Sequence, residues 1–308
     1  GFMAFGDVAA DDVACHDPNW FVPFDVYTLD ASNIAINGQD GHTISAWGVM
    51  YATIFRANWV INNVQNAEAA SEAIKNRSEN EARFLRAIAY FNLVNYFGDV
   101  PFYTKNISSN ESYTIGKTSA VDIMDFIEDE LHIAGGIDEN FNEIEGAGLP
   151  EKGVYELGRA TKGAALALLS RVYLYREKYP EAEKAAKLVI ETGNYDLYWD
   201  DFGANWDNLM KNGIESVFEM QFSPNVPGHD WAENPGCWLT SFLANPNFDP
   251  SQSGGWVIME PEEHMDTIFE ANDKRREMSI FMAGDQYEYA LVGQTWFLPT
   301  TTPTGLMI

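Results

Sequence analysis

The sequence has few basic residues: 19 Lys and Arg stand against 46 Asp and Glu, which gives a net charge of -27 over 308 residues. Affinity for nucleic acid depends on Lys and Arg contacts with phosphate, and binding to an anionic membrane surface depends on the same side chains. The composition therefore argues against both partners. A neutral or cationic partner is compatible with it, and acidity that serves solubility alone explains the charge equally well.

Cysteine is also scarce, with only Cys15 and Cys237. One disulfide between them is allowed but not required, and no zinc or redox spacing is present. The five histidines show no metal-ligand spacing, and the calcium-loop, P-loop, dinucleotide and G-x-S-x-G motifs are missing. We predict no catalytic residue, no metal and no cofactor. Calcium binding by the acidic turn of Asp196, Asp200 and Asp201 is the weaker interpretation, and a solvated turn is the stronger one.

The sequence has no apolar run of membrane-spanning length and no signal peptide. It begins at Gly1 without an initiator methionine and stops after Ile308. We interpret it as a fragment or a processed chain, so the missing targeting signal carries little weight.

Aromatic residues, in contrast, make up 14% of the chain and include nine tryptophans. Apolar residues at helical spacing predict helices over 46–67, 78–97 and 119–134. Trp47 and Trp59 lie on the first of these helices, and we expect both in the core.

Capping signals mark two of these helices. Ser78 with Glu81 has the spacing of a capping box at the start of the second helix. Ser119 with Asp122 is a cap signal for the third, and a loop rich in Gly and Glu follows over 135–157.

The apolar spacing over residues 158–198 predicts a helical hairpin of the tetratricopeptide kind. Thr161 is the expected N-cap of its first helix. Pro180 falls in the first turn of the second helix, where its missing N–H has no partner to lose, and Gly193 suits the left-handed residue after that helix. The hairpin positions that we expect to form its two apolar stripes are Ala165, Leu168, Leu169, Val172, Tyr175, Ala182, Ala185, Ala186, Val189 and Ile190.

After Tyr195 the helical pattern stops. Residues 214–222 alternate with the two-residue period of a strand. A long loop rich in Pro, Gly and Asn follows over 223–257, and loops of this length are usually functional or disordered.

The end of the chain combines both kinds of element. Residues 261–276 predict a short helix begun by Pro261, and 279–298 predict one or two strands, while residues 1–45 read as irregular. The fold class we predict is mostly α, with tetratricopeptide-like hairpins packed against an irregular, loop-rich half with short strands. The expected organisation is a single domain, 1–308, in which 46–193 is the helical scaffold and 1–45 with 194–308 is the irregular half.

Several blocks of the sequence resemble, in order, the SusD/RagB family of nutrient-binding outer-membrane lipoproteins of Bacteroidetes. The resemblance is carried by GDVAADDV at 6–13, W-x3-Y-x2-I-x2-AN-x2-I at 47–61, EARFLRAIAYFNLVNYFGDVPFY at 81–103, GRATKGAALALLSRVYLYREKYPEAEKAAKLVIETGNYDL at 158–197, ESVFEMQFSPN at 215–225 and, loosely, PEEHMDTIFEANDKRR at 261–276. Two features depart from the family. Cys15 follows no apolar signal and is not the lipoprotein cysteine, and family members are longer, with further C-terminal helices.

The resemblance implies a role at the cell surface. Such proteins cover a TonB-dependent transporter of the SusC type, hold an oligosaccharide or another nutrient, and pass it inward. It further implies that the tetratricopeptide half faces the transporter and that the irregular half carries the ligand site. The implied location is the outer membrane, through a lipid anchor that lies outside this sequence.

Sugar rings have apolar C–H faces and polar rims, so flat aromatic side chains next to amides and carboxylates suit them. Because loops carry function disproportionately, the candidate ligand-binding residues are Trp20, Trp206, Trp231, Trp238, Trp256, Asp17, Asn19, Asp230, Asn234 and Asn245. A buried or rim-packing role is the alternative for each tryptophan.

Two other functions remain open from the sequence. A helical glycoside hydrolase would also have Trp-rich loops and many acids, and release of product from a polysaccharide would reveal it. A tetratricopeptide scaffold that binds only proteins would place its aromatic residues in a helical groove, whereas the candidates here lie outside the predicted helices.

Overall fold

The computed structural model describes residues 10, 12–15, 41–206, 210–221, 259–282, 286–289, 294–297 and 306–307. The chain divides into two compact units. One, called the helical unit below, comprises Trp47–Trp199 and Asn205–Met220. The other comprises Gly1–Ala46, Asp200–Ala204 and Gln221–Ile308. The predicted single-domain organisation stays a prediction.

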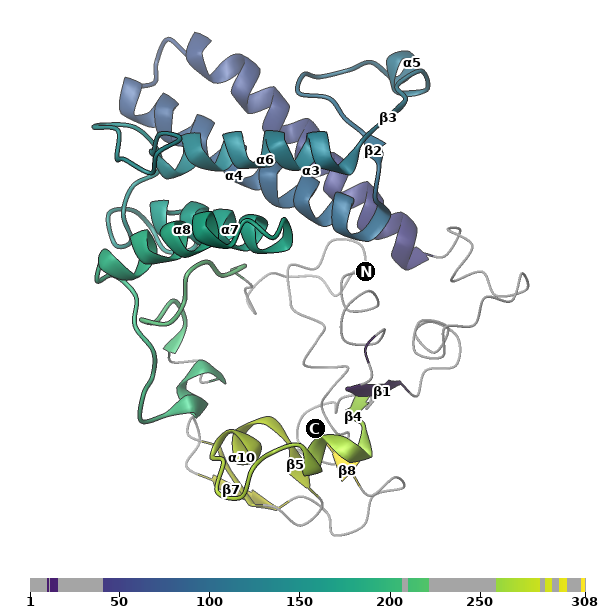
Figure 1. Cartoon of the computed structure of the whole chain (residues 1–308), viewed down its shortest axis with the longest axis vertical. Coiled ribbons are helices and arrows are strands. Elements are labelled where there is room, and N and C mark those ends of the chain that lie inside the picture. The colour runs from purple at the N-terminus through teal and green to yellow at the C-terminus, as the bar shows by residue number, and fades with distance from the viewer. Residues whose placement is uncertain are drawn as a thin grey trace, which may run out of the picture. The chain divides into compact units, whose positions relative to one another are not determined.

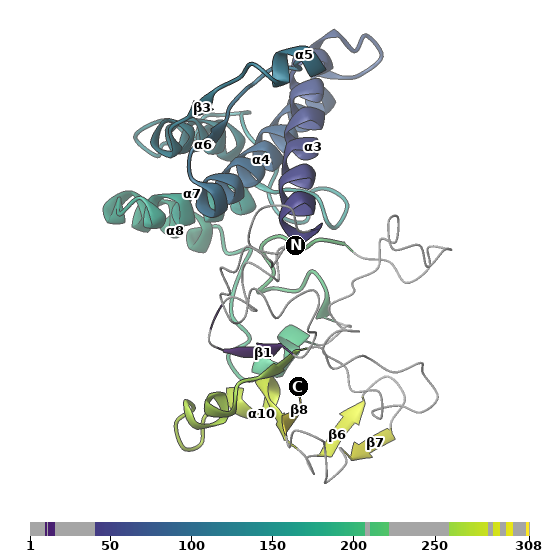
Figure 2. The same cartoon turned by 90° about the vertical axis from the view of Figure 1, so that its right-hand side faces the viewer.

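The helical unit is built from five long helices, of which the first begins just before it. They are α3 (Gly41–Asn63), α4 (Glu72–Phe97), α6 (Ala120–Gly135), α7 (Lys162–Tyr175) and α8 (Tyr179–Glu191). Short elements connect them: η2 (Val64–Asn66), β2 (Val100–Pro101), α5 (Ser109–Ser112) and β3 (Lys117–Thr118), with β2 antiparallel to β3. Helix α4 packs on α6, α6 on α7 and α7 on α8, as Figures 1 and 2 show. The prediction of a mostly α, tetratricopeptide-like fold is confirmed.

The predicted hairpin is confirmed as α7 and α8. The Thr161 hydroxyl accepts a hydrogen bond from the Ala164 N–H at 3.2 Å, so Thr161 is the N-cap of α7. Pro180 lies in the first turn of α8, and Gly193 has the expected left-handed φ of 67°. Helix α6 also follows its signal, because Ser119 caps it and accepts from the Asp122 N–H at 3.1 Å.

The predicted start of α4 is wrong. The helix begins at Glu72 and is capped by Ser71, so Ser78 lies inside it rather than at its end. Its first two turns are polar and show no apolar stripe in the sequence. Contacts from outside the helix stabilise them instead: the Arg77 guanidinium lies 4.4 Å from the centre of the Tyr155 ring, and the Gln65 amide donates to Glu79 at 2.7 Å.

A buried ionic cluster joins α3, α4 and α6. Arg86 and Glu130 are each 2% exposed. The Arg86 guanidinium donates to Glu130 through Nε at 2.8 Å and Nη2 at 2.5 Å, and Nη1 donates to Asn58 Oδ1 at 2.6 Å. Arg83 donates to the other Glu130 oxygen at 2.5 Å. Each ion therefore has its partner and further hydrogen bonds, the condition under which buried charges are tolerated.

The two tryptophans of α3 differ. Trp47 is partly buried and its ring contacts the rings of Tyr51 and Phe97. Trp59 is 58% exposed, so its predicted place in the core is wrong. Trp59 directly follows Asn58, whose side chain points inward to Arg86. Consecutive residues of a helix point in different directions, so position 59 faces solvent.

Two predictions for the second half are also wrong. Residues 214–221 contain bends and no strand, since their backbone groups bond to loop partners rather than to a neighbouring strand. The helix predicted over 261–276 is absent. Pro261 ends strand β4 (Met259–Pro261), a 3-10 turn η5 (Glu263–Thr267) follows, and α10 begins only at Arg275 and ends at Ser279.

Short strands complete the second unit. The sequence predicts one or two strands over 279–298. Strands are confirmed there, but the described residues contain three, β5 (Phe281–Met282), β6 (Gln286–Tyr289) and β7 (Gln294–Phe297), and β8 (Leu306–Met307) follows them. Strands β6 and β7 pair antiparallel, as do β5 and β8. Strand β1 (Val13–Cys15) pairs with β4 and carries the buried Cys15, while Cys237 lies outside the described residues. Of the helices described, none combines the length and apolar character needed to cross a membrane.

Candidate functional site

Of the ten predicted ligand-binding residues, Trp206 alone lies within the described part of the chain, as the last residue of η3 (Phe202–Trp206). The other nine fall outside the described residues: Trp20, Trp231, Trp238, Trp256, Asp17, Asn19, Asp230, Asn234 and Asn245. Their role in ligand binding stays a prediction. The described part of the chain nevertheless contains two hollows, one of which is lined mainly by polar groups.

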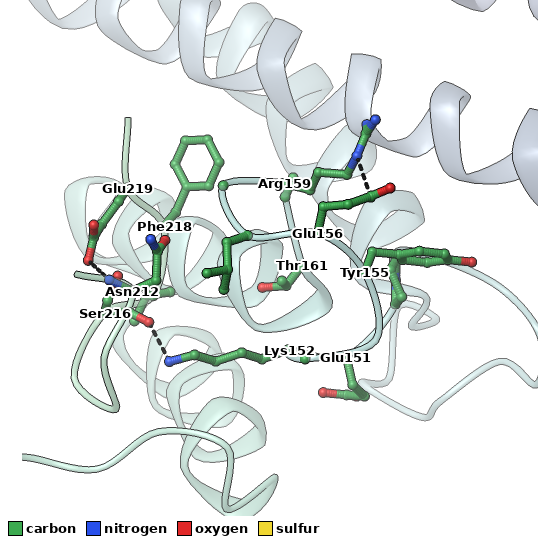
Figure 3. A pocket seen from close by; sticks show the side chains of 16 residues that line it. Glu151, Lys152, Tyr155, Glu156, Arg159, Thr161, Asn212, Ser216, Phe218 and Glu219 are labelled. Atoms are coloured by element: carbon green, nitrogen blue, oxygen red, sulfur yellow. Dashed lines mark hydrogen bonds and ion pairs between the residues drawn. The ribbon is translucent and has the colours of Figure 1, made fainter. Parts of the chain in front are cut away.

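Residues 212–219 run between two hollows of the helical unit. The first lies between this segment and the loop 150–161, and Figure 3 shows its lining. Its volume is about 40 Å³, enough for one or two water molecules. A sugar ring does not fit into it. The residues around this hollow therefore position the segment rather than bind a ligand.

Lys152 is the residue that joins the two walls of the first hollow (Figure 3). Its ammonium donates to the carbonyl of Gly213 at 2.7 Å and to that of Ser216 at 2.8 Å, and it lies 4.6 Å from the centre of the Tyr195 ring. Burial lowers the pKa of the Lys152 ammonium, while the negative charge of Glu219 opposes that shift. A lysine is thus used here as a connector of backbone carbonyls.

Two further contacts fix the same segment. Phe218 packs edge-on against Phe84 of α4, with ring centres 5.1 Å apart. Glu219 accepts a hydrogen bond from the Asn212 N–H at 2.8 Å, marked in Figure 3. The segment is irregular in secondary structure but well anchored.

The second hollow is larger, about 240 Å³, and it lies on the other side of residues 215–219. Its remaining walls are Tyr198, Asn205, Met210 and Gly213. Glu215 crosses it: one carboxylate oxygen, Oε2, accepts from the Tyr198 N–H at 3.1 Å and from the Asn205 amide at 3.0 Å. Of the described residues that line it, two are carboxylates and none is Lys or Arg, so this lining is acidic.

Tyr198 lines the second hollow. Its hydroxyl is buried directly over Gly213, so close that a Cβ at position 213 would collide with it. Within the described residues this hydroxyl has no hydrogen-bond partner. Glycine at 213 is therefore required by this close approach.

Trp199 follows Tyr198 and is the most exposed of the tryptophans whose side chains the structure describes, at 76%. Its indole N–H donates to Asp196 Oδ1 at 2.9 Å, and the same oxygen accepts from the Leu197 N–H at 2.8 Å. The Trp199 hydrogen bond, together with that of Leu197, lowers the pKa of the Asp196 carboxyl. The indole is thus held in place while its faces meet solvent.

Sequence reasoning missed Trp199. The signal that identifies it is the aspartate three residues earlier, in the turn that follows Gly193, because that spacing lets a carboxylate accept from the indole. Asp196 was weighed only with Asp200 and Asp201 for calcium. Across the described ranges, no three His, Cys, Asp or Glu side chains gather closely enough to hold a metal ion.

The comparisons with known proteins identify the family. Residues 9–174, more than half of the chain, match the SusD-like family described as "Starch-binding associating with outer membrane". The chain belongs to the SusD-like family. This confirms the resemblance found in the sequence.

Individual SusD-like proteins are similar over most of the chain. A SusD-like protein of Bacteroides ovatus is 28% identical over 294 residues, which covers 88% of this chain and 47% of that protein. Surface glycan-binding protein A from Bacteroides fluxus has 25% identity and a TM-score of 0.74, covering 92% of this chain and 59% of the other. A laminarin-binding SusD-like protein, at 22% identity, has a TM-score of 0.75 and covers 99% and 66%. The chain spans about half the length of the curated relatives it matches.

Proposed function

We propose that this SusD-like protein binds an oligosaccharide or polysaccharide at the cell surface and delivers it to a SusC-like TonB-dependent transporter in the outer membrane. The observation that carries the proposal is the family match over residues 9–174. The names of similar structures, a surface glycan-binding protein and a laminarin-binding protein, support the glycan as ligand.

The physical properties of the chain agree with this function. A net charge of -27 disfavours nucleic acid and anionic surfaces, whereas neutral glycans carry no charge to repel. The rigid helical layers from α4 to α8 suit a scaffold, and we assign to them the surface that faces the transporter. The irregular half, 1–45 with 194–308, carries the ligand site in this proposal, and the two parts act as one domain.

The protein acts without catalysis in this proposal. It is held at the outside of the outer membrane by a lipid anchor, as the family resemblance implies. Turnover of a polysaccharide by the purified protein, detected as released reducing ends, would contradict the binding-only role and favour the glycoside hydrolase alternative.

The ligand site is tested by calorimetry on the full-length protein. Trp231→Ala and Trp238→Ala should each weaken glycan binding by about 2- to 12-fold, the loss expected from one aromatic contact. The thermal unfolding of both variants should stay that of the parent protein. Unchanged affinity in both variants would remove these two residues from the site.

The transporter partnership needs a separate measurement. Affinity purification of the full-length protein from its own outer membrane should retain a SusC-like transporter in about equal amount. Recovery of the glycan-binding protein alone, under conditions that preserve other membrane complexes, would contradict delivery to a transporter.

A further inference from the structure

The second hollow has the size and polarity of a ligand subsite, and Trp199 follows one of its lining residues, Tyr198, in the chain. The hollow has a volume of about 240 Å³, which is the share of roughly eight water molecules in the liquid. Pockets for drug-sized ligands begin near roughly 300 Å³. The hollow is thus on the scale of one sugar ring rather than of an extended chain.

The polar groups of this hollow are acceptors. Glu215 Oε2 has both of its hydrogen bonds from protein donors, whereas Oε1 has none within the described part of the chain. An ionised carboxylate accepts about four hydrogen bonds in all. Asn205 uses its amide N–H towards Glu215, which leaves its carbonyl oxygen as an additional acceptor. Hydroxyl groups of a sugar are the donors that suit such a set.

The charge of the hollow limits which class of sugar it can bind. Among the described residues, the hollow is lined by Glu215 and Glu219 and by no cationic side chain. The ammonium of Lys152, which lines the neighbouring hollow, is already bonded to two backbone carbonyls. A uronate or sulfate group placed here would meet like charge at short range, where salt screens poorly. An uncharged sugar meets no such penalty.

Trp199 supplies the aromatic surface. Because Asp196 holds its indole N–H, the ring loses little freedom when a ligand packs on it, which favours binding. The apolar C–H face of a pyranose matches an exposed indole face. Trp199 directly follows Tyr198, which lines the hollow and donates its backbone N–H to Glu215, so the backbone of Trp199 is one residue away from the hollow.

We propose that the second hollow binds one uncharged pyranose unit of the glycan through Glu215 and Asn205, while Trp199 stacks against a neighbouring unit. This subsite rests on the proposed glycan-binding function. It is separate from the tryptophans of the 223–257 loop, and it makes the protein selective for neutral over acidic glycans.

The test uses the full-length protein and calorimetric titration with laminarihexaose, maltohexaose, mannohexaose, a xyloglucan heptasaccharide and hexagalacturonate. At least one neutral oligosaccharide should bind, and hexagalacturonate should bind at least tenfold more weakly. Trp199→Ala should weaken neutral binding about 2- to 12-fold. Glu215→Gln keeps the shape of the side chain but not its charge, so it should weaken neutral binding and narrow the difference from hexagalacturonate.

Leu197→Ala is the matched control, since Leu197 is exposed on the same turn and makes no side-chain hydrogen bond. It should leave every affinity unchanged. A second readout avoids dependence on folding: the Trp199 indole N–H signal, assigned by its loss in Trp199→Ala, should shift when the neutral ligand is added to the parent protein.

The outcomes separate the two proposals. Neutral binding that Trp231→Ala and Trp238→Ala weaken, but that Trp199→Ala and Glu215→Gln leave intact, would overturn the subsite and keep the function. Preference for hexagalacturonate would overturn the selectivity and with it the subsite. Failure of all five oligosaccharides to bind would overturn the subsite and remove the support for the proposed function.

Discussion

The hairpin of α7 and α8 and the segment 194–221 follow each other in the chain, yet they hold their shape by different means. The hairpin is specified locally, by a cap at Thr161, a proline in a first turn and apolar side chains at helical spacing. Within this segment, residues 212–219 form neither helix nor strand and are positioned by distant residues, above all Lys152 and Phe84. The scaffold helices and this irregular stretch are therefore encoded at different ranges of sequence.

The largest effect should come from the ionic cluster that joins the scaffold helices. Glu130→Ala leaves Arg86 and Arg83 without their buried partner. We expect a loss of about 3–5 kcal/mol in the free energy of unfolding, measured by urea denaturation, because an unpaired charge then stays buried. Glu183→Ala, which breaks an exposed pair with Lys187, should lower the free energy of unfolding far less, because solvent screens that pair. Similar losses in both variants would contradict a special role for the cluster.

A second large effect should appear where the two regions meet. Tyr195 lies over Gly163 in α7, and a Cβ added at 163 would stand 2.5 Å from the ring and hydroxyl. Gly163→Ala should therefore destabilise the protein by about 1–3 kcal/mol, measured as a lower urea midpoint.

Gly48 in α3 provides the matched control, since a Cβ there meets nothing within 4 Å. Gly48→Ala should stabilise the protein by about 0.5–1 kcal/mol, because alanine favours the helix. A loss of stability in Gly163→Ala with a gain in Gly48→Ala would confirm that Tyr195 packs on α7. A change in the same direction in both variants would contradict this packing.

An effect that is local rather than global should be confined to the irregular segment. Lys152→Met removes the ammonium that bonds the Gly213 and Ser216 carbonyls, and it should cost about 1.5–3 kcal/mol of local stability. Amide hydrogen exchange should accelerate over residues 212–219 and stay unchanged in α7 and α8. Lys187→Met, at an exposed helix position, should alter neither region. Faster exchange throughout the hairpin would show that the segment and the scaffold do not separate in stability.

The smallest effect should follow acidification at Trp199. The hydrogen bonds from Trp199 and Leu197 lower the pKa of Asp196 below its usual 3.8. The contact is therefore complete above pH 3.8 and is lost as the pH falls through the lower folded-state pKa. The indole N–H resonance of Trp199 should titrate with that midpoint. Asp196→Asn keeps a hydrogen-bond acceptor without a charge, so the Trp199 resonance of that variant should not titrate. A midpoint at or above 3.8 would contradict the contact.

The elements that sequence predicts well are those whose signals are local. The caps at Thr161 and Ser119 and the left-handed Gly193 were read correctly, because each involves residues within one or two turns. The start of α4 was missed because its first turns depend on Tyr155 and Gln65, which are not part of the helix.

The strand predicted over 214–222 fails for the same physical reason. Alternation describes which side chains share a face, but a strand also needs a partner strand, and here the Ser216 carbonyl accepts from the Lys152 ammonium instead. Pro261 was misread in the same way, since its pairing with Val13 on β1 is a contact across the sequence. The exposed Trp199 is not predicted, because the acidic residues around it indicate only a solvated turn. Trp231 and Trp238 remain candidates from the sequence alone.

The cluster of Asn58, Arg86 and Glu130 also bears on the alternatives that the helices must avoid. Packed helices have alternative arrangements that are related by a slide of one turn, about 5.4 Å. Any such slide would separate Arg86 from Asn58 on one neighbour and from Glu130 on the other. We therefore expect the cluster to fix the register of the helices. It adds little to the stability of the native packing, but every shifted packing has a higher free energy because its buried charges lose their partners.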